Sequence, residues 1–145
     1  MVENIIENEE YKKLITKQIS EITSFLCTKN QEFSIVANLK GVEFIPELPK
    51  KIKDKMHILS LFDLKNYTYT TLAIDDEFLS FEAAFGADNY VSTLKISLFS
   101  ILQIIIDESI IYLNPLATVE KFHNDEVRKS INVFKNNPNN KKFNS

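Results

Sequence analysis

The chain has 145 residues, of which 44% are hydrophobic and 26% are charged, enough for one ordinary globular domain with a modest tail. Its formal net charge is -3, from 17 basic and 20 acidic residues, which argues against a nucleic-acid partner. The single cysteine, Cys27, cannot form an internal disulfide, and no apolar run approaches the roughly 20 residues of a membrane span. These features, with an N-terminus that lacks a basic signal-peptide region, predict an unprocessed protein of the cytoplasm without a membrane anchor.

The first predicted element is an amphipathic helix over residues 9–27, where apolar side chains recur every three or four positions. Asn8 is placed to cap it, and Glu9 and Glu10 occupy its first turn. The pattern leaves two interpretations open, because such a helix either covers the open end of its own sheet or pairs with a second copy of the chain. In the second interpretation, the residues that contact the other copy are Leu14, Ile15, Ile19 and Ile22.

Beyond the helix the apolar period changes to two. Residues 33–39 alternate in this way and predict a strand with one buried face. Residues 42–55 contain Pro46, Pro49 and several lysines, so they are expected to form an exposed connection. Further strands are expected at residues 56–61 and 67–74, separated by a polar turn at 63–66.

An acidic turn, Asp75-Asp76-Glu77, then leads into a strand whose Leu79, Phe81, Ala83 and Phe85 share one face. Gly86 begins the next reversal, which ends at Asn89. The remaining strands are expected at residues 90–96, 101–106 and 110–113, with a short helical turn capped by Ser97.

This order of elements predicts an α+β, mainly β, protein in which the N-terminal helix precedes a small open β-barrel or two packed antiparallel sheets. From residue 119 to 145 the chain is rich in Asn and Lys and has only scattered apolar residues. Such a segment buries too little surface to offset the entropy of ordering it, so it is expected to be a flexible tail after a domain at 1–118.

The residues that carry chemistry are few. Neither His57 nor His123 has a partner at a spacing typical of a nucleophile relay or a metal site. The acids at 75–77 are expected to be solvated turn residues, and Cys27 a small buried apolar group. Because the two glycines also form no phosphate-binding loop, we expect a protein without cofactor or metal that is not an enzyme.

A binding module needs only a rigid sheet, an apolar groove and a strand edge with free backbone groups, and this sequence supplies the residue types for all three. A strand end rich in Phe and Ala beside a glycine suits the close approach of an extended peptide. Alternating Phe and Leu residues are also typical of a core, so each remains open to that interpretation.

Several motifs occur in an order that resembles the stringent starvation protein B (SspB) family, the adaptors that deliver tagged proteins to the ClpXP protease. They are Leu39-x-Gly41-Val42-x-x-x-Pro46, the acidic turn with Phe81-x-Ala83-x-Phe85-Gly86, the segment Ser97-Leu98-Phe99-Ser100-Ile101, and Asn114-Pro115. The resemblance covers about residues 33–115. It implies an N-terminal helix, a small open barrel related in outline to Sm-like folds, and a homodimer, which favours the second interpretation of the helix.

The resemblance also implies a groove that binds part of the ssrA tag, the peptide added to products of stalled translation. The candidate residues for the groove are Val42, Leu59, Leu61, Phe81, Ala83, Phe85 and Gly86. SspB adaptors carry a tail motif that docks on ClpX, and the similar residues here are Ser130, Ile131, Val133, Phe134 and Lys135. Those tail residues could equally fold back on the domain.

The function implied is tethering, in which one surface holds a tagged protein and the tail holds ClpX. The alternative is a chaperone or assembly factor that binds apolar segments without reading a tag. A third interpretation, an Sm-like RNA-binding protein, is opposed by the acidic charge.

Overall fold

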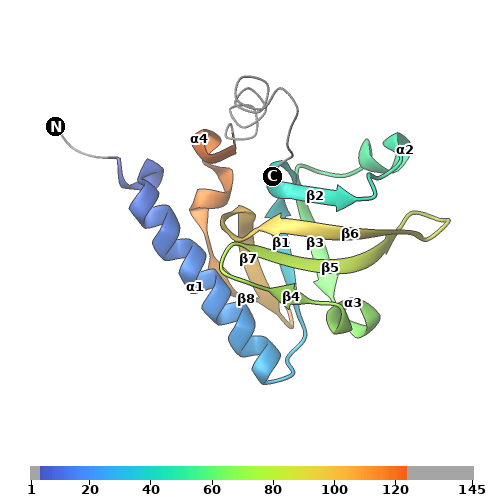
Figure 1. The fold of residues 1–145 in the computed structure, drawn as a ribbon, viewed down its shortest axis with the longest axis horizontal. Coiled ribbons are helices and arrows are strands. Elements are labelled where there is room, and N and C mark those ends of the chain that lie inside the picture. Colours follow the sequence, from blue (N-terminus) through green and yellow to red (C-terminus); the bar gives the residue numbers. More distant parts are fainter. Residues whose placement is uncertain (1–3, 124–145) are drawn as a thin grey trace, which may run out of the picture.

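A computed structural model describes residues 4–123 of the chain. Helix α1 precedes two antiparallel sheets that face each other, so the expected fold class is confirmed (Figure 1). The first sheet has the strand order β3-β1-β7-β8 and the second the order β2-β6-β5-β4. The α-helices are α1 Glu9–Thr28, α2 Lys50–Lys53, α3 Asn66–Thr70 and α4 Glu120–His123. The strands are β1 Phe33–Asn38, β2 Val42–Ile45, β3 Leu59–Leu64, β4 Ala73–Ile74, β5 Phe78–Phe85, β6 Tyr90–Ser97, β7 Ile101–Ile106 and β8 Ser109–Leu113. The short 3-10 turns are η1 Ile5–Glu7, η2 Leu39–Gly41, η3 Leu98–Ser100 and η4 Pro115–Thr118.

The core lies between the inner faces of the two sheets. Period-two alternation turns Phe62 of β3 and Phe81 of β5 inward, and their ring centroids lie 5.9 Å apart. Ile35 of β1 and Leu94 of β6 are fully buried beside them. Each strand therefore contributes one apolar face to a shared interior, as the alternating pattern predicts.

Helix α1 closes the side of the sandwich. The Asn8 side chain accepts a hydrogen bond from the Tyr11 N–H at 2.8 Å, which confirms the expected cap. The Tyr112 hydroxyl of β8 donates to Gln18 Oε1 at 2.7 Å, and the Ser20 hydroxyl donates to the carbonyl of Asp75, beside β4, at 3.0 Å. The helix thus spans the seam between the edge strands of the two sheets. Figure 1 shows it along one side of both sheets.

The placement of α1 corrects one of the two interpretations of the helix. Ile15 and Ile19 are buried against the chain's own core, so they do not lie on a surface open to a second copy. Ile22 is half-buried and packs against the same core. Leu14 alone of the four is exposed, with 51% of its surface accessible.

Residues 42–55 are not simply the exposed connection that the prolines predict. Val42–Ile45 forms β2, because Phe44 is buried opposite Leu94 of β6 and the ladder satisfies the backbone before Pro46 interrupts it. The single helical turn α2 follows Pro49. Tertiary pairing outweighs the local breaker signal here.

The strand expected at residues 67–74 is also wrong over most of its length, since α3 occupies its first half and only β4 is extended. Asn66 adopts a positive φ of 54°, and the hydroxyls of Thr70 and Thr71 donate to backbone carbonyls three residues earlier. These local bonds stabilise a helical turn in spite of the β-propensity of Thr and Tyr. The strand expected at residues 56–61 runs instead over β3 and includes Asp63, where the sequence predicts a turn.

The packed domain extends past residue 118. Phe122 of α4 has only 2% of its surface exposed and makes an edge-to-face contact with Phe99 at 6.1 Å. Residues 120–123 therefore belong to the domain, although their polar neighbours suggested a tail. Within residues 4–123 no helix is both long and apolar enough to cross a membrane.

Candidate functional site

The Phe-x-Ala-x-Phe-Gly motif forms the C-terminal half of β5. Phe81 has 1% of its surface exposed and belongs to the core, so it does not line a groove. Ala83 and Phe85 are half-buried. Gly86 follows with a φ of 76°, a left-handed conformation that favours glycine. The motif thus starts in the core at Phe81 and ends at Gly86, at the end of β5 that lies opposite Phe78.

Two apolar side chains from the segment after β1 complete this end. Phe44 of β2 makes an edge-to-face contact with Phe85 at 5.9 Å. A Cβ placed on Gly86 would approach Ile52 of α2 to 3.0 Å, so the glycine also permits close packing there. Ala83, Phe85 and Gly86 therefore share one apolar rim, formed with Phe44 and Ile52, which we call the β5 rim.

The other expected groove residues lie elsewhere. Leu59 and Leu61 are exposed on the outer face of the first sheet, because Ser60 and Phe62 take the inward positions of β3. Val42 lies at the start of β2, in a cleft beside α1. The seven residues are therefore divided among the core, the β5 rim, an outer sheet face and a cleft, and the structure brings only three of them together.

The cleft beside α1 has a volume of about 810 Å³. α1 forms one wall, and the first residues of β2 with parts of β5 and β6 form the other. Apolar contacts inside it come from Phe78, Phe99 and Phe122, while lysines and carboxylates from α1 and the strands surround them. The described lining holds both signs of charge in equal number, so it suits a ligand that carries both.

Two of the sequence motifs meet next to this cleft. A side chain at Gly41 would overlap the hydroxyl of Ser100, so only glycine allows η2 to pass η3. η2 joins β1 of one sheet to β2 of the other, and it makes this connection by passing close to η3. The motifs around Val42 and Ser97 therefore reflect a packing requirement.

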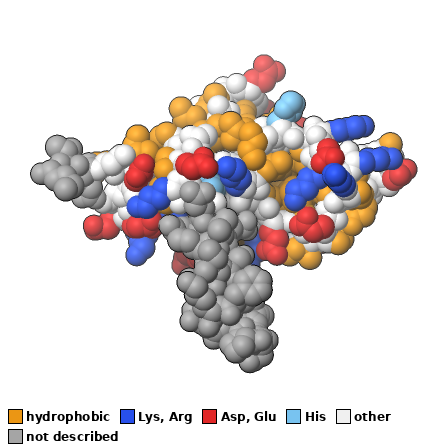
Figure 2. Space-filling view, turned by 90° about the horizontal axis from the view of Figure 1, so that it is seen from above, with side chains coloured by type: hydrophobic (Ala, Val, Ile, Leu, Met, Phe, Trp, Pro, Cys, Tyr) orange, Lys and Arg blue, Asp and Glu red, His pale blue; other side chains and the backbone are white. Residues whose placement is uncertain are grey.

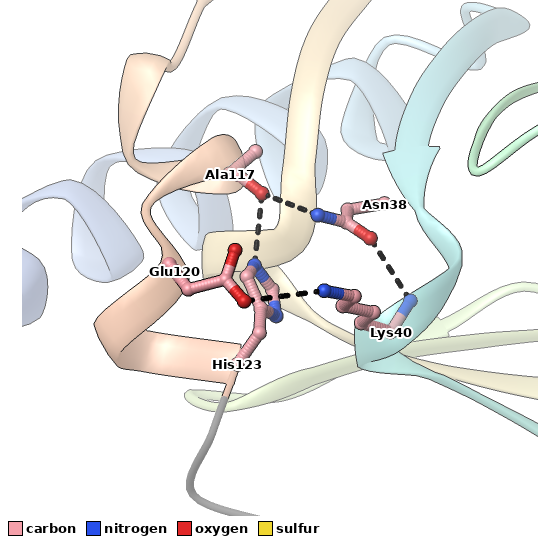
Figure 3. Close-up of polar contacts among 5 residues, drawn as sticks. All are labelled: Asn38, Lys40, Ala117, Glu120 and His123. Carbon is pink, nitrogen blue, oxygen red and sulfur yellow. Dashed lines mark hydrogen bonds and ion pairs between the residues drawn. The ribbon is translucent and has the colours of Figure 1, made fainter.

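His123 lies at one end of the cleft and helps to fix α4 (Figure 3). Its Nε2 is 2.8 Å from the carbonyl of Ala117, which also accepts a bond from Asn38 Nδ2 at 2.9 Å. Lys40 Nζ forms an ion pair with Glu120 at 3.6 Å. Burial, followed by the nearby positive charge of Lys40 and Lys12, lowers the pKa of His123, so the ring is neutral at physiological pH. The contacts are those of a structural histidine.

The acidic turn has a structural explanation. Asp75 Oδ1 accepts hydrogen bonds from the backbone N–H groups of Glu77 at 2.8 Å and Phe78 at 2.7 Å. These bonds lower the pKa of Asp75, because they stabilise the charged form. The side chain closes the turn that starts β5, and among residues 4–123 no group of three or more His, Cys, Asp or Glu side chains is arranged to hold a metal ion.

The remaining candidates give no sign of nucleophilic chemistry. Cys27 is half-buried, and burial raises the pKa of its thiol, which keeps it protonated. His57 is exposed before β3. The expected docking residues at 130–135 lie outside the described residues. On the face shown in Figure 2, basic and acidic side chains are interspersed, a pattern unlike the basic stripe of a nucleic-acid site.

Comparison with known proteins adds no relative, because no protein-family model matches the chain and no curated protein is significantly similar to it.

The sequence patterns do not predict the cleft or the fixing of α4 by His123. The cleft depends on how η2 places β2 beside α1, which no local pattern encodes. The one sequence signal for α4 was Phe122, an aromatic residue in an otherwise polar stretch.

Proposed function

We propose that this protein is a peptide-tag adaptor of the SspB type, which holds ssrA-tagged proteins and tethers them to ClpXP. The observation that carries the proposal is the β5 rim, where the motif of the resemblance places Ala83, Phe85 and Gly86 together at a strand end. An N-terminal helix followed by two antiparallel sheets, as the resemblance implies, also supports it. No bond is broken in this function, so the sparse titratable chemistry of the described residues suits it.

An edge strand beside the β5 rim provides the backbone partner for an extended peptide. β2 pairs with β6 on one side and has no strand on its other side among the described residues. A tag that added to this edge would pass Val42 and reach the apolar contact between Phe44 and Phe85. Main-chain bonds would supply affinity, and the rim would select the side chains of the tag.

Two further interactions belong to the proposal. Residues 130–135 dock on ClpX, which raises the concentration of the bound substrate near the protease. A second copy of the chain doubles the number of tags and tails. Because Ile15 and Ile19 are buried, Leu14 is the exposed member of the predicted set that α1 offers to such a dimer, along with the exposed Phe25 of α1 and Ile111 of β8. Leu14→Glu should shift the mass measured by light scattering towards the monomer.

The direct test is fluorescence anisotropy of a labelled ssrA peptide against a scrambled peptide of the same composition. Ala83→Glu should weaken binding of the tag by about tenfold or more, because it places a charge in the rim. Ala84→Glu is the matched control, since Ala84 is exposed on the opposite face of the same strand. A thermal melt of both variants separates lost binding from lost folding. Equal affinity of Ala83→Glu and wild type would refute the proposed site.

A second candidate function is a chaperone that binds apolar segments without a tag. The exposed apolar side chains on the outer face of the first sheet, including Leu61 and Leu113, favour it. This function predicts equal binding of the true and scrambled peptides, with loss of both on Leu61→Lys.

A further inference from the structure

The cleft beside α1 and the β5 rim lie at opposite ends of the second sheet. Phe78, the first residue of β5, lines the cleft, whereas Phe85, its last residue, belongs to the rim. Because β5 has eight residues, these two residues stand about 23 Å apart along the strand, at about 3.3 Å per residue. In Figure 1, β6 points towards α1 and β2 points away from it, so β6 ends at the cleft where β2 begins.

Strand β2 leads from one of these places to the other along the edge of the sheet. Val42, its first residue, belongs to the cleft lining. Phe44, two residues later, makes the edge-to-face contact with Phe85 at the rim. Among the described strands β2 pairs only with β6, so its outer edge has no strand partner. A peptide that adds to this edge beside the rim therefore leaves it next to the cleft.

The two places differ in chemistry. The rim consists of half-buried and buried apolar side chains. In the cleft, Lys13 and Lys17 belong to the wall formed by α1, while Glu43 and Lys95 belong to the wall formed by the sheet, where they are cross-strand neighbours. All four of these charged side chains are exposed. The rim therefore suits an apolar part of a peptide, and the cleft suits a charged part.

We propose that the bound tag is held at both ends of the second sheet, with an apolar part at the β5 rim and a charged part, about seven residues away, in the cleft beside α1. The inference rests on the proposed function, because one peptide occupies both places. The unpaired edge of β2 selects this occupant, since it leads from the rim into the cleft. Two linked contacts bind more tightly than either alone, because the second forms within the complex made by the first.

Peptide length combined with a cleft substitution tests the inference. Fluorescence anisotropy compares the whole ssrA tag with its two halves, each too short to reach both places. The whole tag should bind at least about tenfold more tightly than either half. Thr16→Trp fills the cleft from α1 and should remove this advantage, while leaving the affinity of the half that binds the rim unchanged. Ser24→Trp is the matched control, because Ser24 is exposed on the same helix and lies outside the cleft lining.

The outcomes separate this inference from the proposed function. Thermal melts identify a variant that fails to fold, and Lys17→Trp, at an exposed position of the lining, is the second cleft variant. Salt at 1 M, where the Debye length is about 3 Å, should also reduce the advantage of the whole tag. Equal affinity of the whole tag and one half, or an unchanged advantage in both cleft variants, would overturn the inference and leave the proposed function in place. Binding of no peptide would overturn both.

Discussion

The outer faces of the two sheets differ, although their inner faces are alike. On the first sheet a row across four strands joins Leu61, Val36, Gln103 and Leu113 in register. Leu61 and Leu113 are 58% and 59% exposed. On the second sheet the corresponding row joins Glu43, Lys95 and Ser80.

Folding requires only that the inner faces be apolar, since each sheet covers the inner face of the other. The second sheet has a mixed exterior, in which Ile45 and Val91 are exposed along with charged and polar residues. The first sheet presents apolar side chains that contribute little to the core, and such a patch is typical of a contact surface. The comparison separates residues that hold the fold from residues available to a partner, and the following experiments test that division.

The largest effect should come from the inner faces. Phe81→Ala should lower the free energy of unfolding by about 3–5 kcal/mol, because it removes a fully buried ring that contacts Phe62 and leaves a cavity. Urea denaturation measures the loss. Leu61→Ala on the outer face should cost less than about 1 kcal/mol. Similar losses for the two variants would show that the outer face also holds the fold.

A smaller loss is expected where the second sheet meets α1. Asp75→Ala should lower the free energy of unfolding by about 1 kcal/mol, since the Glu77 and Phe78 N–H groups lose their acceptor. Asp75→Asn keeps an acceptor oxygen and should lose less. Because the folded-state pKa of Asp75 is lowered, its contribution is complete above the unfolded value near 3.8 and disappears as pH falls through the folded value. Acid titration of the unfolding free energy checks this, and a flat difference between wild type and Asp75→Ala from pH 6 to pH 2 would contradict it.

The packing of α4 beside η2, which joins the two sheets, should weaken in mild acid. The pKa of His123 is lowered from 6.5 mainly by burial, so the unfolded state binds the proton more readily. The contribution of the neutral ring to the free energy of unfolding is therefore complete above pH 6.5 and declines as pH falls below that value. Amide exchange of Phe122, whose N–H donates to the Val119 carbonyl, should accelerate in that range. His123→Phe keeps an aromatic ring and should remove most of this pH dependence; an unchanged profile would assign it to another group.

The smallest change in stability should come from a charge on the outer face of the first sheet. Leu61→Lys should alter the free energy of unfolding by about 0.5 kcal/mol or less, yet lower the fluorescence of a bound hydrophobic dye. Glu43→Lys, on the outer face of the second sheet, keeps that position charged, so it is the control and should leave dye binding unchanged. Equal dye binding by wild type and both variants would remove the distinction between the two faces.

The sequence by itself determined the elements whose patterns are strong. Helix α1 and its Asn8 cap, the alternation in β5 and the α+β class follow from periodicity and capping, which are local properties. At the β5 rim, Gly86 also followed from the motif, since a positive φ at a reversal favours glycine. Local interactions are sufficient to predict an element where one short segment contains all the residues that cause it to form.

The tertiary structure decided the rest. It made β2 a strand through pairing with β6, turned residues 66–70 into a helix, and buried Ile15 and Ile19 in the chain's own core. It also separated Leu61 from Phe85, which the family resemblance grouped in one groove. Which face of a strand meets water depends on the neighbour that covers it, and that neighbour comes from a distant part of the chain.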